Sequence, residues 1–89
     1  MDLRTVILAF LAARYPAAYY EAAILARVNR SGHVDKPAAA DEISEALRLL
    51  SNRFKCVEPE LDRVSGKVFW TATEEGKLEW VRSGQLHVG

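Results

Sequence analysis

The chain has 89 residues, which suits one domain, and its 49% hydrophobic content supports a packed core and excludes a disordered chain. Twelve Lys and Arg balance twelve Asp and Glu, so overall charge does not attract the chain to nucleic acid or membrane. Any such attraction depends on local segregation of charge. The single cysteine, Cys56, excludes an internal disulfide and a cysteine-rich zinc site.

The first predicted element is a helix from Asp2 to Arg14, with Asp2 as its N-cap. Its apolar residues recur at helical spacing: Leu3, Val6, Ile7, Phe10 and Leu11. Tyr15 precedes Pro16 and ends the helix, because a residue before proline avoids the helical region. The apolar run is too short to cross a bilayer and has the wrong flanks for a signal peptide. We therefore expect a cytoplasmic protein that does not bind membranes.

A second helix is predicted to start between Ala17 and Tyr20 and to run to Asn29. Ser31-Gly32 closes it, since glycine accepts the left-handed conformation at a helix end. A loop from His33 to Pro37 follows. The alanine-rich start of this helix permits close packing, either within the core or across a dimer.

The third helix, from Ala38 to Phe54, has the clearest pattern. Its apolar stripe is Ile43, Leu47, Leu50 and Phe54. Acidic residues occupy its first turns (Asp41, Glu42, Glu45) and basic residues its end (Arg48, Arg53, Lys55), which complements the helix dipole.

Two strands are predicted next, Cys56 to Leu61 and Val68 to Thr73, joined by a polar turn. Pro59 restricts the first strand to a sheet edge or a bulge. Cys56 is interpreted as a buried structural thiol rather than a nucleophile or redox sensor.

Thr73 is the predicted N-cap of a short final helix. Leu78 and Val81 are expected to form its apolar face, with Trp80 alongside. Residues 84–89 are expected to be a flexible tail.

The segment from Trp70 to Gly76 (WTATEEG) resembles the end of the wing in bacterial and phage winged helix-turn-helix proteins. The segment from Ala46 to Val57 (ALRLLSNRFKCV) is similar to their recognition helix and its exit into the wing. The resemblance covers about residues 3 to 82. It implies an α+β fold, a winged helix spanning residues 1–83, with a three-helix core, a two-stranded β-hairpin wing and a short C-terminal helix.

The resemblance also implies double-stranded DNA as the partner, with the third helix in the major groove and the wing on the backbone. The groove-facing positions would be Ser44, Arg48, Ser51, Asn52 and Lys55. Phosphates would be met by Arg63 and Lys67 in the wing, flanked by Arg27, Arg30 and Lys36. Arg48 suits a guanine edge and Asn52 an adenine edge.

The DNA-binding hypothesis is a transcriptional regulator that acts as a homodimer, because specific sites need two half-site readers. The terminal helices are the expected dimer elements. The basic residues also fit a second interpretation, a solvated surface with cations at helix ends.

A winged helix that binds another protein, as an accessory subunit or a small phage or mobile-element protein, is the alternative. The neutral charge, the acidic start of the third helix and the Tyr and Trp residues favour it.

No residues are spaced for catalysis or for a cofactor. His33 and Asp35 share a loop, but nothing near them in the sequence supplies a further metal ligand. No Ser or Thr has His and carboxylate partners at the spacing of a nucleophile and its base. We therefore expect neither an enzyme nor a metal site.

Overall fold

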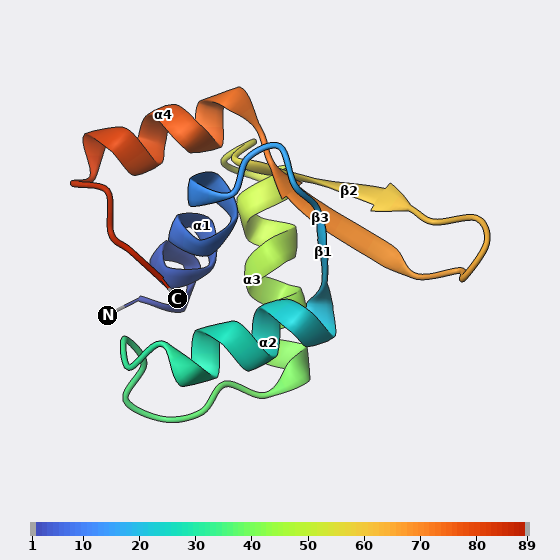
Figure 1. Ribbon diagram of the computed structural model, residues 1–89, viewed down its shortest axis with the longest axis horizontal. Coiled ribbons are helices and arrows are strands. Elements are labelled where there is room, and N and C mark those ends of the chain that lie inside the picture. Colours follow the sequence, from blue (N-terminus) through green and yellow to red (C-terminus); the bar gives the residue numbers. More distant parts are fainter. Residues whose placement is uncertain (1, 89) are drawn as a thin grey trace.

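Residues 2–88, which the computed structural model describes, form four helices and a three-stranded antiparallel sheet, an α+β arrangement (Figure 1). The elements in chain order are α1 (Leu3–Ala13), β1 (Tyr19–Tyr20), α2 (Glu21–Arg30), α3 (Ala40–Asn52), β2 (Val57–Leu61), β3 (Val68–Ala72) and α4 (Glu74–Arg82). The hairpin β2–β3 projects to one side of the helices. None of the helices in this part of the chain has the length and apolar character needed to cross a membrane.

Helix α1 is the centre of the core and packs against α2, α3, α4 and β3. Asp2 caps it as predicted, because its Oδ1 accepts a hydrogen bond from the Arg4 backbone N–H at 3.0 Å. All residues from Val6 to Ala12 are buried. This stretch has no free face, so α1 cannot serve along its length as the dimer element that we expected from the sequence.

Strand β1 corrects the predicted start of the second helix, which began between Ala17 and Tyr20. Tyr19 pairs with Trp70 and Tyr20 with Phe69, so both tyrosines are extended and α2 starts only at Glu21. Their side chains alternate across the sheet: the Tyr19 ring meets Phe10 edge-on at 5.0 Å, and Tyr20 stacks on Phe69 at 3.9 Å. These ring contacts outweigh the helical preference of the neighbouring alanines.

The predicted hairpin is confirmed, since β2 pairs antiparallel with β3 from Val57↔Ala72 to Leu61↔Val68. The sheet order is β1-β3-β2, so Pro59 lies on an edge strand, as expected. Trp70 secures the root of the hairpin, because its Nε1–H donates to Glu21 Oε2 at 3.0 Å.

Helix α3 is shorter than predicted at both ends. Ala38 is held in the preceding loop, where its N–H and C=O both bond the Asn29 side chain, at 2.8 and 3.1 Å. Ile43, Ala46, Leu47 and Leu50 are buried as the pattern required, but Phe54 lies beyond the helix and is 44% exposed. Lys55 then takes φ 56° and turns the chain into β2.

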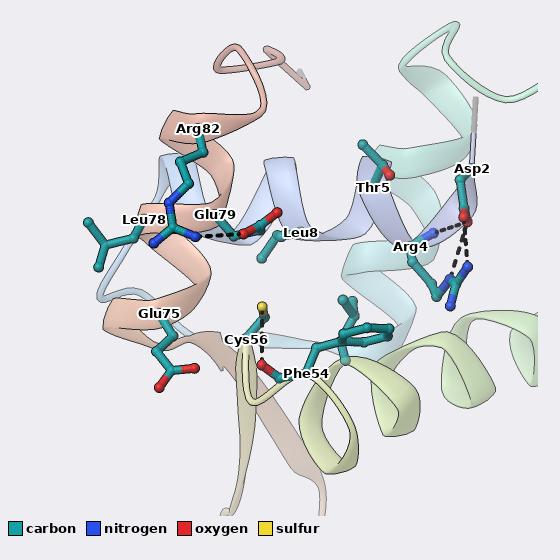
Figure 2. Close-up of a pocket in the computed structure, with 11 residues that line it drawn as sticks. Asp2, Arg4, Thr5, Leu8, Phe54, Cys56, Glu75, Leu78, Glu79 and Arg82 are labelled. Atoms are coloured by element: carbon teal, nitrogen blue, oxygen red, sulfur yellow. Dashed lines mark hydrogen bonds and ion pairs between the residues drawn. The ribbon is translucent and has the colours of Figure 1, made fainter.

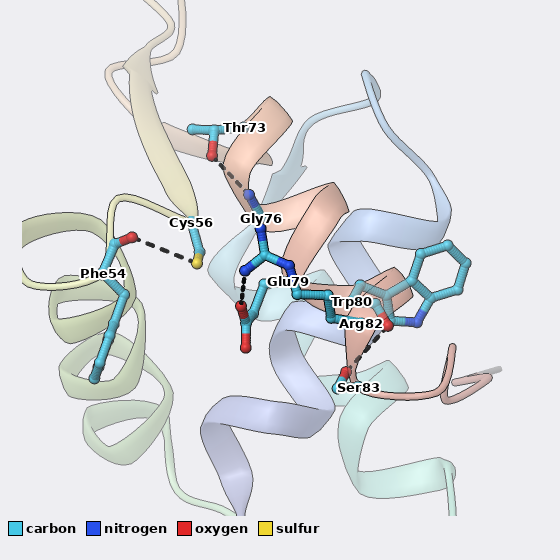
Figure 3. A network of polar contacts seen from close by, with 8 residues as sticks. All are labelled: Phe54, Cys56, Thr73, Gly76, Glu79, Trp80, Arg82 and Ser83. Carbon is cyan, nitrogen blue, oxygen red and sulfur yellow. Dashed lines mark hydrogen bonds and ion pairs between the residues drawn. The ribbon is translucent and has the colours of Figure 1, made fainter.

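Helix α4 turns a different face to the core from the one we expected. Leu78 and Val81 are largely exposed, whereas Gly76 is buried and Trp80 packs against the core. Thr73 fixes this orientation. Its hydroxyl donates to the Lys55 carbonyl at 2.7 Å. The same hydroxyl accepts from the Gly76 N–H at 3.1 Å (Figure 3). Gly76 can therefore rest directly on the Cys56 backbone.

The segment after α4 also departs from expectation. Its residues 84–88 fold back onto the domain, and Val88 is 3% exposed. The Trp80 Nε1–H donates to the Leu86 carbonyl at 2.8 Å, and His33 Nε2 donates to the His87 carbonyl at 3.1 Å. The packed domain therefore extends past the boundary at residue 83 that we had drawn.

Candidate functional site

The exposed face of α3 lies opposite its buried stripe. Arg48 and Asn52 are exposed one helical turn apart, and Ser44 and Ser51 beside them are partly exposed. Lys55 is exposed just beyond the helix. The five groove-facing candidates thus lie along α3 and its exit, and they form one solvent-accessible group.

Arg48 is held only weakly. Its Nη1 lies 3.9 Å from Glu45 Oε2, and its Nη2 donates to Ser44 Oγ at 3.4 Å. Both charged side chains are well exposed, at 65% and 70%. An exposed pair of this kind is worth about 0–1 kcal/mol, so a ligand can redirect the Arg48 guanidinium at small cost.

The start of α3 is acidic, as predicted, with Asp41, Glu42 and Glu45 all exposed. Glu42 has a structural role, because its Oε1 accepts a hydrogen bond from the Ala39 N–H at 2.9 Å and so caps the helix. Any anion that approaches α3 meets these carboxylates at the N-terminal end and Arg48 and Lys55 toward the C-terminal end.

The tip of the hairpin is a defined turn built on Asp62. Its carboxylate accepts hydrogen bonds from the Val64 N–H at 3.1 Å and from the Ser65 hydroxyl at 2.8 Å. These hydrogen bonds lower the pKa of Asp62 below its ordinary value, and the bond from Ser65 has the largest effect. Arg63 and Lys67 are exposed on this turn, and Lys67 Nζ lies 5.1 Å from the centre of the Tyr20 ring.

The three remaining candidates lie elsewhere. Arg27 and Arg30 are exposed in the last turn of α2, and Lys36 is exposed in the loop that follows. Figure 1 places this end of α2 and its loop at the opposite end of the molecule from the hairpin tip. The ten candidates therefore form three separate groups, on α3, on the hairpin tip and at the end of α2.

A groove between α1, the end of α3 and α4 was not anticipated from the sequence. It has a volume of about 530 Å³, and Leu8, Leu50 and Cys56 are its buried apolar residues. Figure 2 shows Phe54 and Arg4 on one side and the α4 residues Glu79 and Arg82 on the other. The apolar spacing of α3 hid this groove from sequence analysis, because Phe54 continues the apolar stripe and was therefore expected in the core.

The thiol of Cys56 is buried, in agreement with the structural role predicted for it. Burial, followed by the negative charges of Glu79 and Glu75, raises its pKa above the ordinary value. Its Sγ donates to the Phe54 carbonyl at 3.5 Å. A protonated thiol is a poor nucleophile, and these surroundings do not activate it.

The structure brings His33 close to His87, which the sequence separates widely, through the ring-to-carbonyl hydrogen bond already described. Residues 2–88 nevertheless contain no group of three His, Cys, Asp or Glu side chains arranged to hold a metal ion.

The chain matches no family model, no curated protein and no solved structure. A functional assignment therefore depends on the exposed face of α3, the hairpin and the groove.

Proposed function

We propose that the chain is a winged-helix protein that binds duplex DNA, with α3 in the major groove and the β2–β3 hairpin as the wing. The observation that carries this proposal is the direct passage from an exposed helix into a projecting hairpin, through the turn at Lys55. The order of the elements, with β1 before α2 and α4 after the hairpin, supports it.

The chemistry of the exposed α3 face supports base recognition. A helix fits the major groove, where Arg pairs with the O6 and N7 atoms of guanine and Asn pairs with the N6 and N7 atoms of adenine. Arg48 and Asn52 are one turn apart and reach the same side of the helix. The short side chains of Ser44 and Ser51 beside them allow close approach of the helix to DNA.

The wing would provide the phosphate contacts. Arg63 and Lys67 are exposed on a turn that Asp62 holds in one conformation, so binding orders few additional groups. Asp41 and Glu45 repel phosphates from the start of α3, which lowers non-specific affinity and leaves discrimination to the bases. We propose transcriptional regulation as the biological role.

A module that binds another protein is the second candidate. The observation that favours it is the groove beside α4, where Phe54 and Leu78 are 44% and 56% exposed. Exposed aromatic and aliphatic side chains in a concave surface are typical of protein interfaces. The two functions use different faces of the domain and are separable by mutation.

The test is selection of bound duplexes from a random pool, followed by titration of the selected duplex at several salt concentrations. DNA binding predicts an enriched sequence and an affinity that falls as salt rises. Arg48→Ala should relax the preference at one base position, at a cost of about 1–3 kcal/mol.

Arg53→Ala is the matched control, because it removes the same charge from a side chain that lies over the Phe54 ring, outside the candidate face. Absence of binding at low salt would contradict the DNA proposal. A protein partner captured through the Phe54 groove would then favour the second candidate.

A further inference from the structure

Large apolar side chains are exposed on and beside α4. Phe54 and Leu78 line the groove and are 44% and 56% exposed, and Val81, also on α4, is 46% exposed. Contiguous apolar surface bordered by charged residues is typical of an interaction site. The bordering charges are Asp2, Arg4, Glu75, Glu79 and Arg82.

We propose that this groove binds α4 of a second copy of the chain, so that two α4 helices pack antiparallel about a two-fold axis. Such an interface is self-complementary, because the same groove and the same helix occur on both partners. Leu78 of each copy would then reach the Phe54 side of the other groove. Packing would cover apolar side chains that the isolated chain leaves in water.

The charges of α4 favour a second copy as the occupant. Glu74 and Glu75 lie in the first turn of α4 and Arg82 lies in its last turn, with Lys77 and Glu79 between them. In an antiparallel pair centred between Leu78 and Glu79, Glu75 of one copy faces Arg82 of the other, and the reverse pair forms too. The two helix dipoles are then antiparallel, which also favours the pair.

The ion pairs within a single copy are compatible with this arrangement. Arg82 Nη1 lies 3.3 Å from Glu79 Oε2, and both side chains are more than half exposed, at 73% and 52%. Within residues 2–88, Glu75 has no ion-pair partner. Arg82 of a second copy would supply that partner.

This inference does not depend on DNA binding. None of the candidate DNA-contacting side chains on α3, the wing or α2 lines the groove. Association of two copies can be measured without any nucleic acid.

The test is sedimentation velocity on the full chain over a wide range of protein concentration. Unmodified protein should form dimers as its concentration rises. Glu75→Lys and Arg82→Glu should each weaken association by at least ~10-fold, because each reversal places like charges opposite each other twice in the symmetric pair.

Mixing the two variants is the decisive measurement. A Glu75→Lys chain and an Arg82→Glu chain have opposite charges at both cross-helix contacts, so the mixture should form heterodimers although neither variant dimerises well alone. Residues 75 and 82 are two helical turns apart within one chain, so recovery cannot come from a repaired intramolecular pair.

Leu78→Asp should also abolish association, whereas Val64→Asp, at the 98% exposed wing tip, should leave it unchanged. Circular dichroism checks that each variant is folded. A monomer at every concentration, dimers indifferent to the α4 variants, or a mixture that stays monomeric would each overturn the proposal and direct attention to a different occupant.

Discussion

A Cβ atom on Gly76 would lie 2.0 Å from the carbonyl oxygen of Cys56. The first turn of α4 therefore rests directly on the backbone that enters β2, and only glycine allows this approach. The contact fixes where α4 lies and hence the shape of the groove beside it.

Gly76→Ala should destabilise the protein by about 3 kcal/mol, the upper end of the usual cost of overpacking. The direction of the change in stability is informative, because a Gly→Ala substitution in an unobstructed helix stabilises the helix by about 1 kcal/mol. Urea denaturation measures the change in the free energy of unfolding. Gly32→Ala is the comparison: its site is open and its φ is 79°, so we expect a cost of only about 1 kcal/mol. Stabilisation by Gly76→Ala would show that α4 does not approach β2 this closely.

Val88→Ala should lower the free energy of unfolding by about 2 kcal/mol, from lost apolar burial and the cavity that remains. Val88 is 3% exposed, and the hydrogen bond from Trp80 to Leu86 holds its segment against the domain. Thermal and urea denaturation measure the loss. Val64→Ala removes the same atoms from a 98% exposed site and should change stability by less than about 0.5 kcal/mol. Equal, negligible effects would mean that the segment after α4 is loose in solution.

Acid should loosen the turn at the tip of the β2–β3 hairpin, because this turn is built on Asp62. Hydrogen bonds from Ser65 and Val64 lower the pKa of this carboxyl in the folded protein. Its stabilising contribution is therefore complete above the ordinary value of 3.8 and is lost as the pH falls through the folded pKa. NMR titration should give a midpoint below 3.8 for Asp62 and show the amide signals of Val64 and Ser65 moving with it. In Asp62→Ala those amide signals should lose this titration, and a midpoint above 3.8 in the parent would contradict the assignment.

Lys67→Ala should weaken binding to all duplexes alike and reduce the slope of log affinity against log salt by ~0.9, one phosphate contact. Lys77→Ala is a close match, because the two ammonium groups lie at similar distances from tyrosine rings, 5.1 Å from Tyr20 for Lys67 and 5.5 Å from Tyr15 for Lys77. Lys77 is on α4, outside the wing, and its loss should leave the slope unchanged. Fluorescence anisotropy at several salt concentrations separates the two. Equal slopes for the two variants would show that the proposed wing does not contact DNA phosphates.

Much of the fold was readable from local patterns. The caps at Asp2 and Thr73, the apolar spacing of α3 and the edge position of Pro59 each depend on residues within a few positions of one another. The paired strands were also recognisable, because Val68–Ala72 is rich in β-branched and aromatic residues.

The sequence identified the candidate DNA-contacting residues one by one, but it did not show which of them lie close together in the folded protein. Helical spacing places Arg48 and Asn52 on one face, since both are on α3. It gives no information on the distance between the end of α2 and the hairpin tip, which Figure 1 shows at opposite ends of the molecule. That distance is set by how separate elements pack.

The sequence alone determined the helices with strong apolar periodicity, the hairpin and the caps, because backbone geometry and short-range hydrogen bonds specify these within one or two turns. Tertiary structure decided the rest: that Tyr19 and Tyr20 form a strand, that Phe54 and Leu78 border a groove, and that Val88 is buried. Each of these depends on a partner far along the chain, such as Trp70 for Tyr19. Such partners are the residues whose side chains pack closely together in the core, and that packing is defined only in the folded chain.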